Sequence, residues 1–247
     1  MNDVIIIMMG ALLFAYLEQF HPLVPINKKK FLKLDVISFL TGLGFVFIIT
    51  RFVLTFDFGY WLADLSIFES FRHTAKSEVQ WMNLAAVLLI GDFGFYWGHR
   101  FMHLPWMWRT HVWHHSPQEL YWFSGMRTSF MNSLITRSPY FFAASVYKLN
   151  PVEIAILIII VAFINFFIHA NIPVHMGILE KIFITPKFHR IHHAADHQYY
   201  DSNFGNILVI WDYLFGTAID PNDHPEDIPV GVKEVENKNL VKLLLGI

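Results

Sequence analysis

The stretch HRFMHLPWMWRTHVWHH occupies residues 99–115 and follows directly on an apolar run. It holds His99 and His103 four residues apart, and then His111 with His114 and His115. Residues three or four apart share a face of an α-helix, so each set can aim several ring nitrogens at one point. The pattern continues further along the chain, where the matching residues are His169 at the end of an apolar run and the set His189, His192 and His193.

These histidines predict a site for two metal ions. They supply nine imidazoles, whereas one tetrahedral zinc takes four ligands. Imidazole suits iron, zinc, copper and nickel, so the ligand type does not select the metal. The chain has no cysteine, which excludes thiolate zinc sites and cysteine-ligated iron–sulfur clusters. A tenth ligand is left open, with His175 and His197 as candidates because they lie near these sets.

The composition predicts an all-α membrane protein with four to five transmembrane helices. Of 247 residues, 55% are hydrophobic and 15% are charged, against about 25% charged in soluble domains. A net charge of −2 gives no sign of a nucleic-acid partner. The first apolar run lacks the basic region and cleavage site of a signal peptide, so we expect it to be retained. The candidate spans are Val4–Phe20, Val36–Phe56, Val79–Trp97, Phe130–Tyr147 and Pro151–Ile168. The fourth span contains Arg137 and Pro139, so it could be kinked or re-entrant.

The charged loops predict the orientation of these spans. Lys28, Lys29, Lys30 and Lys33 lie between the first two spans, so that loop should be cytoplasmic. Alternation of the spans then brings every dense histidine set to the cytoplasmic side. The next loop should face outward, because it carries Asp57, Asp64, Glu69 and Glu78 against Arg72 and Lys76.

The ordered set HxxxH, HxxHH and a distant HxxHH resembles the fatty acid hydroxylase/sterol desaturase superfamily. The similar region runs from about Asp92 to Thr217, and His169-Ala-Asn171-Ile resembles the additional histidine segment of that family. The resemblance implies two iron ions held on a cytosolic helical cap above a membrane bundle. It divides the chain into N-terminal helices and loops (1–78), a catalytic domain (79–217) and a tail (218–247). The implied iron ligands are His99, His103, His111, His114, His115, His169, His189, His192 and His193.

The same resemblance implies an O₂-dependent, non-haem di-iron oxidoreductase that hydroxylates a lipid-like C–H bond. Desaturation of a sterol or carotenoid is the alternative within the family. The implied partners are the bilayer, a lipid-like substrate and a separate electron-transfer protein, either cytochrome b5-like or a ferredoxin with its reductase. The short chain resembles bacterial members, which predicts a bacterial inner membrane. The substrate, the regiochemistry, the electron donor and the oligomeric state stay open.

Three polar residues near the histidines are candidates to position them. Asp92 lies two helical turns before His99 and could accept a hydrogen bond from a ligand histidine; a bundle-facing polar contact to an arginine or serine is the equal alternative. Asn165, one turn before His169, could act similarly, and Asn203 is a weaker candidate that could instead cap a helix.

Other functions fit the histidine spacing less well. A membrane metal transporter should place its polar ligands near mid-membrane, whereas these sets follow the ends of spans. A di-haem cytochrome would use single histidines spaced along facing helices, and adjacent histidine pairs do not suit that geometry. A lipid-binding scaffold would not need converging imidazoles.

Overall fold

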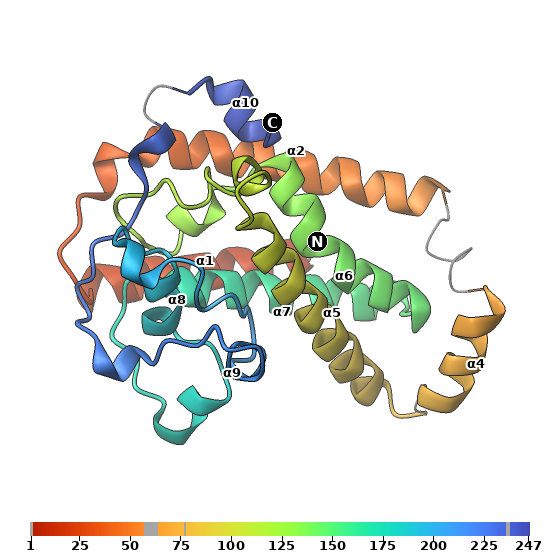
Figure 1. Cartoon of the computed structure of the whole chain (residues 1–247). Coiled ribbons are helices and arrows are strands. Elements are labelled where there is room, and N and C mark those ends of the chain that lie inside the picture. The colour runs from red at the N-terminus through yellow and green to blue at the C-terminus, as the bar shows by residue number, and fades with distance from the viewer. Residues whose placement is uncertain (1, 57–63, 77, 236–237) are drawn as a thin grey trace.

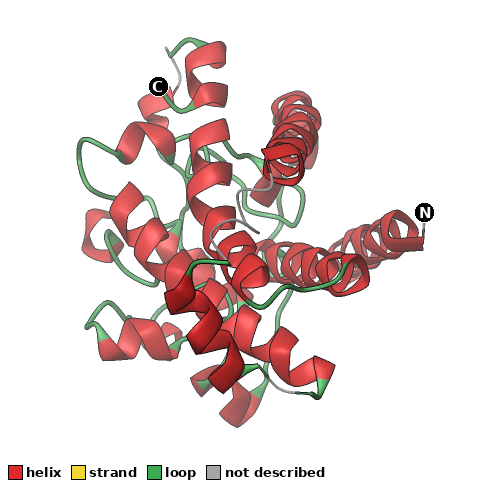
Figure 2. Ribbon diagram, turned by 90° about the vertical axis from the view of Figure 1, so that its right-hand side faces the viewer, coloured by secondary structure: helices red, strands yellow, loops and turns green. Residues whose placement is uncertain are grey.

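The computed structural model describes residues 2–56, 64–76, 78–235 and 238–247. Within these ranges the chain forms helices, and its strand-like pairing is limited to two isolated β-bridges (Figure 2). The expected all-α class is therefore confirmed for the described part. The long helices are α1 (Asn2–Phe20), α2 (Leu32–Phe56), α5 (Gln80–Met102), α6 (Phe130–Val146) and α7 (Pro151–His169), and the shorter ones are α4 (Ser66–Ala75), α8 (Pro186–His192), α9 (Ile210–Leu214) and α10 (Leu240–Leu245).

Each of the apolar segments predicted from the sequence forms a helix. In the described part of the chain, α7 is the one helix long and apolar enough to cross a membrane, with 19 residues and a mean hydropathy of 2.6. Val4–Phe20, within α1, is a shorter apolar helix. α6 continues through Pro139 rather than turning back. Asp57, which contributed to the predicted orientation, lies outside the described residues.

The sequence explains where α7 begins. The Asn150 side chain accepts hydrogen bonds from the backbone N–H groups of Val152 and Glu153, and the Glu153 carboxylate accepts one from the Asn150 N–H. This capping box satisfies amides that the first helical turn would otherwise leave unpaired. Pro151 adds a fixed φ at the first helical position. The turn between α6 and α7 is therefore set locally.

Glycines let α5 and α6 approach each other closely. A Cβ atom placed on Gly91 would collide with the ring of Tyr140, and one on Gly94 would lie 2.5 Å from Cβ of Pro139. Side chains of α6 fill the space between the two helices, so the facing positions of α5 must be small residues. Tyr140 is 4% exposed and belongs to the largest buried apolar cluster.

One end of the long helices gathers the functional segments. α5 ends there, α6 begins there and α7 ends at His169, while α1 lies against α7 (Figure 1). Glu18 at the end of α1 accepts hydrogen bonds from the backbone N–H groups of Trp122 and Asn171. Asp35 at the start of α2 forms a buried ion pair with Arg127. These carboxylates tie the helix ends to the loops that carry the histidines.

We expect Gly94→Ala to destabilise the protein, because the added methyl group overpacks the contact with Pro139 by about 1–3 kcal/mol. The matched control is Gly44→Ala on the exposed side of α2, where a Cβ would meet nothing within 4 Å. Thermal unfolding of both variants in the same detergent tests this. Equal melting temperatures for the two variants would contradict the proposed close approach of α5 and α6.

Candidate metal centre

The structure brings all nine predicted histidines into two adjacent groups. In each group one potential ligand atom from every histidine lies within 4.8 Å of those of the others. All but His103, which is partly buried, are at most 8% exposed. Segments separated by about ninety residues therefore converge on one volume. The first group is His99, His103, His111, His115 and His192, and the second is His114, His169, His189 and His193.

The two groups do not follow the sequence motifs. Residues four apart stay together, as His111 and His115 do in the first group, while His114 between them joins the second. In the same way His192 separates from His193. Adjacent residues in a helical turn point about 100° apart, whereas residues four apart share a face. Each HxxHH set therefore contributes to both groups, which corrects the expectation that each set aims at a single point.

Outward hydrogen bonds fix the orientation of six rings. In four of them Nδ1 donates to a backbone carbonyl oxygen at 2.7–2.9 Å, and a carbonyl can only accept. His103 Nδ1 lies 3.2 Å from Asp201 Oδ1, and His111 Nδ1 contacts Asn132 Oδ1. The proton on Nδ1 leaves a lone pair on Nε2. The four carbonyl pairs are His99 with Phe204, His114 with Arg127, His169 with Asn165 and His192 with Ser202.

The Nε2 lone pairs that face inward would repel each other unless a cation lay between them. Nε2 of His99 lies 2.9 Å from Nε2 of His111, although both atoms are acceptors. Nε2 of His114 lies 3.3 Å from Nε2 of His169 in the second group. Among the described residues, the buried Nε2 atoms of His103, His115 and His192 have no hydrogen-bond partner. Neutral imidazoles with their other nitrogen held by an oxygen are the usual arrangement of metal-ligating histidines, so the residues present fit a pair of metal ions.

Burial keeps these rings in the form that binds metal. It lowers the pKa of His114 to about 4. Burial and the neighbouring imidazoles also hold the pKa values of His115, His192 and His193 well below the ordinary value. At neutral pH these side chains are therefore uncharged and keep a free lone pair.

The polar residues singled out from the sequence act differently from the expectation. Asp92 does not reach a histidine; its carboxylate accepts hydrogen bonds from the N–H groups of Ile207 and Leu208 and from the Trp211 indole. Asn165 contributes its backbone carbonyl to His169, not its side chain.

Asn203 has no hydrogen bond to a histidine either. It adopts a φ of +54° and links the segments around Phe188 and Ile219 through its side-chain amide. Asp92 and Asn203 thus shape the loop whose carbonyls hold the rings. Among the described residues, the alternative contact of Asp92 with an arginine or serine is not formed either, because its carboxylate is held by the segment 207–211.

Two residues that contact the histidines were missed. Asn132 contacts His111 from the first turn of α6, and Asp201 contacts His103 from a turn with a φ of +58°. Asn132 could have been found as a polar residue in the first turn of an apolar helix. The sequence around Asp201 shows no spacing that would have indicated its contact with His103. His175 and His197, considered as a tenth ligand, are exposed and belong to neither group.

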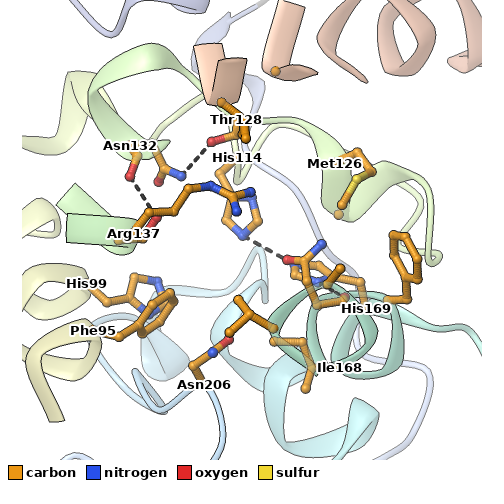
Figure 3. A pocket seen from close by; sticks show the side chains of 18 of the residues that line it. Phe95, His99, His114, Met126, Thr128, Asn132, Arg137, Ile168, His169 and Asn206 are labelled. Atoms are coloured by element: carbon orange, nitrogen blue, oxygen red, sulfur yellow. Dashed lines mark hydrogen bonds between the residues drawn. The ribbon is translucent and has the colours of Figure 1, made fainter. Parts of the chain in front are cut away.

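An apolar cavity of about 220 Å³ adjoins both groups. Side chains from α1, α2, α5, α6 and α7 line it, and His99, His114 and His169 form part of its wall (Figure 3). A largely apolar cavity with a few convergent polar groups is typical of a small-molecule site. The arrangement can therefore hold an apolar molecule directly beside a metal pair.

We expect the two neighbouring histidines of the last motif to affect metal content unequally. His193→Ala leaves three ligands in its group and His192→Ala leaves four, so the first variant should lose about one of two metal ions and the second less. Elemental analysis of the purified protein measures this. His197→Ala is the control, since its side chain is 93% exposed. Full metal content in His193→Ala would contradict the assignment of the second group.

Comparison with known proteins gives the family. The fatty acid hydroxylase profile matches residues 84–217. Alkylglycerol monooxygenase from Xenopus tropicalis is 35% identical over 129 residues, which are 52% of this chain and 28% of that protein. The same enzyme from Homo sapiens is 34% identical over 51% of this chain and 28% of its own. Ornithine lipid hydroxylase OlsE from Rhizobium tropici is 32% identical over 59% of this chain and 44% of its own.

The chain thus matches less than half the length of each of these relatives. No solved structure matches it significantly. The matching region covers more than half of the 247 residues and includes every histidine of the two groups. The chain therefore belongs to the fatty acid hydroxylase family.

Proposed function

We propose that this protein is a membrane-bound, O₂-dependent, non-haem di-iron oxidoreductase that hydroxylates a C–H bond of a lipid-like substrate. The observation that carries the proposal is the convergence of nine imidazoles, eight of them buried, on two adjacent points beside an apolar cavity. Relatives named alkylglycerol monooxygenase and ornithine lipid hydroxylase support it. Desaturation remains the alternative outcome at the same site. A relative with 25% identity is named very-long-chain aldehyde decarbonylase, so similar chains are named for more than one reaction.

The nine histidines are proposed as the iron ligands. When bound, two iron ions would supply reduction of O₂ with two externally donated electrons and removal of hydrogen from an unactivated C–H bond. The protein's part is to fix the rings through their outward Nδ1 hydrogen bonds, and to keep water out. The apolar wall of the cavity, including Phe95 and Ile168, serves the second purpose (Figure 3). The electrons are proposed to come from a separate protein of the cytochrome b5-like or ferredoxin type.

The proposed membrane placement puts the histidine end of the helices at the cytoplasmic side. α7 is predominantly apolar and ends at His169, so its histidine would lie where the helix leaves the bilayer. The lysines at 28–30 lie at the same end, between α1 and α2. Positive loops favour the cytoplasmic side. We further propose a bacterial inner membrane, with 79–217 as the catalytic domain, 1–78 as its membrane support and 218–247 as a peripheral tail.

We expect cells that express the wild-type chain to accumulate a lipid with one additional oxygen atom, absent from cells with His192→Ala/His193→Ala. The double variant removes one histidine from each group, so it should abolish the chemistry. Comparative lipid mass spectrometry makes the measurement, and His197→Ala serves as the active control. A lipid lacking two hydrogens instead would assign desaturation. If no lipid differed between wild type and the double variant, the proposed function would be wrong.

A further inference from the structure

An arginine without a partner reaches into the cavity. Arg137 extends from α6 into the space beside the histidines (Figure 3). Among the described residues, none forms a hydrogen bond or an ion pair with its guanidinium. The described residues that line the cavity include no aspartate or glutamate. The cationic group is therefore left unpaired in mainly apolar surroundings.

Other arginines near the site each have polar partners, although Nη2 of Arg127 is buried without one, and Arg137 differs in having none within the described part of the chain. Arg127 pairs with Asp35 and donates to Ser116, and Arg190 donates to Asn171. An unpaired charge among apolar side chains is costly, and inside a membrane helix it usually marks a binding or transport site. The unpaired group is therefore best explained by a ligand that supplies its partner.

The histidine groups add a second reason to expect an anion here. Every ligand atom in both groups comes from an imidazole, which is neutral when it binds a metal. The charge of two divalent ions would not be offset by the ligands themselves. The exposed Asp201, beside His103, is the carboxylate in contact with these rings in the described structure. A cavity bordered by a metal pair and a guanidinium therefore favours negative charge.

We propose that the cavity binds an amphiphile with a carboxylate or phosphate group, and that Arg137 pairs with this anionic group while the hydrocarbon part fills the apolar remainder. The proposal rests on the proposed function, because it names the substrate class of the same site. Guanidinium forms two parallel hydrogen bonds with either anion, which gives orientation as well as affinity. Arg137 then acts as a residue that determines specificity and positions the substrate, not as a metal ligand.

Binding measurements on the iron-loaded full chain test this proposal. Three ligands of equal chain length serve as probes: hexadecanoate, hexadecyl phosphate and uncharged hexadecanol. Calorimetry in nanodiscs of zwitterionic lipid compares wild type with Arg137→Gln and Arg137→Lys. Arg109→Gln is the matched control, since it removes the same charge from an exposed position.

We expect Arg137→Gln to bind at least one anionic probe about tenfold to a hundredfold more weakly, as befits a lost charge-assisted hydrogen bond. Arg137→Lys keeps the charge but loses the paired hydrogen bonds, so its affinity should fall between those of wild type and Arg137→Gln. Hexadecanol binding should be equal in all variants. Loss for hexadecanoate alone would identify a carboxylate lipid, and loss for hexadecyl phosphate alone a phosphate ester. Equal weakening of all three probes, or no weakening of either anion, would overturn the proposal.

Thermal unfolding without ligand separates binding from folding. Removal of an unpaired, partly buried charge should raise the melting temperature of Arg137→Gln, as is common where a binding residue is strained. Anionic probes should stabilise wild type more than the variant. A lower melting temperature combined with equal loss of hexadecanol binding would assign Arg137 to folding and refute the anion site.

The same samples distinguish the two proposals. Iron content and oxidised product are measured alongside binding. Charge-selective binding without any oxidised product would leave the anion site standing and refute the proposed function. Oxidised product with charge-independent binding would refute the anion site alone.

Discussion

The mutual approach of imidazole lone pairs is the constraint on which the rest of the structure depends. Nε2 of His114 lies 3.3 Å from Nε2 of His169, and Nε2 of His99 lies 2.9 Å from that of His111. All four of these rings hold their Nδ1 proton toward an oxygen, so neutral rings cannot relieve the repulsion in either pair by a simple tautomer change. A cation between the rings removes it. The fold must therefore hold the rings together until the metal contributes its own stabilisation.

Buried carboxylates provide that support one step away from the rings. Asp212 accepts hydrogen bonds from the N–H groups of Phe204 and Gly205 at 2.7 and 2.8 Å. The Phe204 carbonyl in turn accepts the Nδ1–H of His99. Asp92 anchors the next residues of the same loop, and Asp35 anchors Arg127, whose carbonyl holds His114. Acidic residues thus position backbone carbonyls, and the carbonyls position the ligands.

The sequence predicted the chemistry of the site better than its geometry. Histidine spacing identified eight of the nine rings, because i,i+3 and i,i+4 pairs are a short-range property of a helical turn. The ninth, His169, stands alone and was indicated by its position after an apolar run and by the family resemblance. Spacing could not divide the rings into groups, since that depends on how a turn and a short helix face each other across the fold. The expected hydrogen bond from Asp92 to a histidine was wrong for the same reason. The groups that donate to its carboxylate lie more than 110 residues further along the sequence. The helical segments were predictable from apolar runs, which are local.

The position of Arg137 links the metal site to the choice of substrate atom. The guanidinium and the histidines border one cavity of about 220 Å³, so an anion held by the first cannot lie far from the second. The hydrocarbon next to the anionic group is then the part that reaches the histidines, while the rest of the chain extends away among the apolar residues of α2 and α7. An arginine further from the histidines along α6 would hold the anionic group further away. A carbon nearer the far end of the hydrocarbon would then reach the histidines. The same side chain that selects charge would therefore also set which carbon is presented, as expected when binding energy away from the reacting atoms is used for alignment.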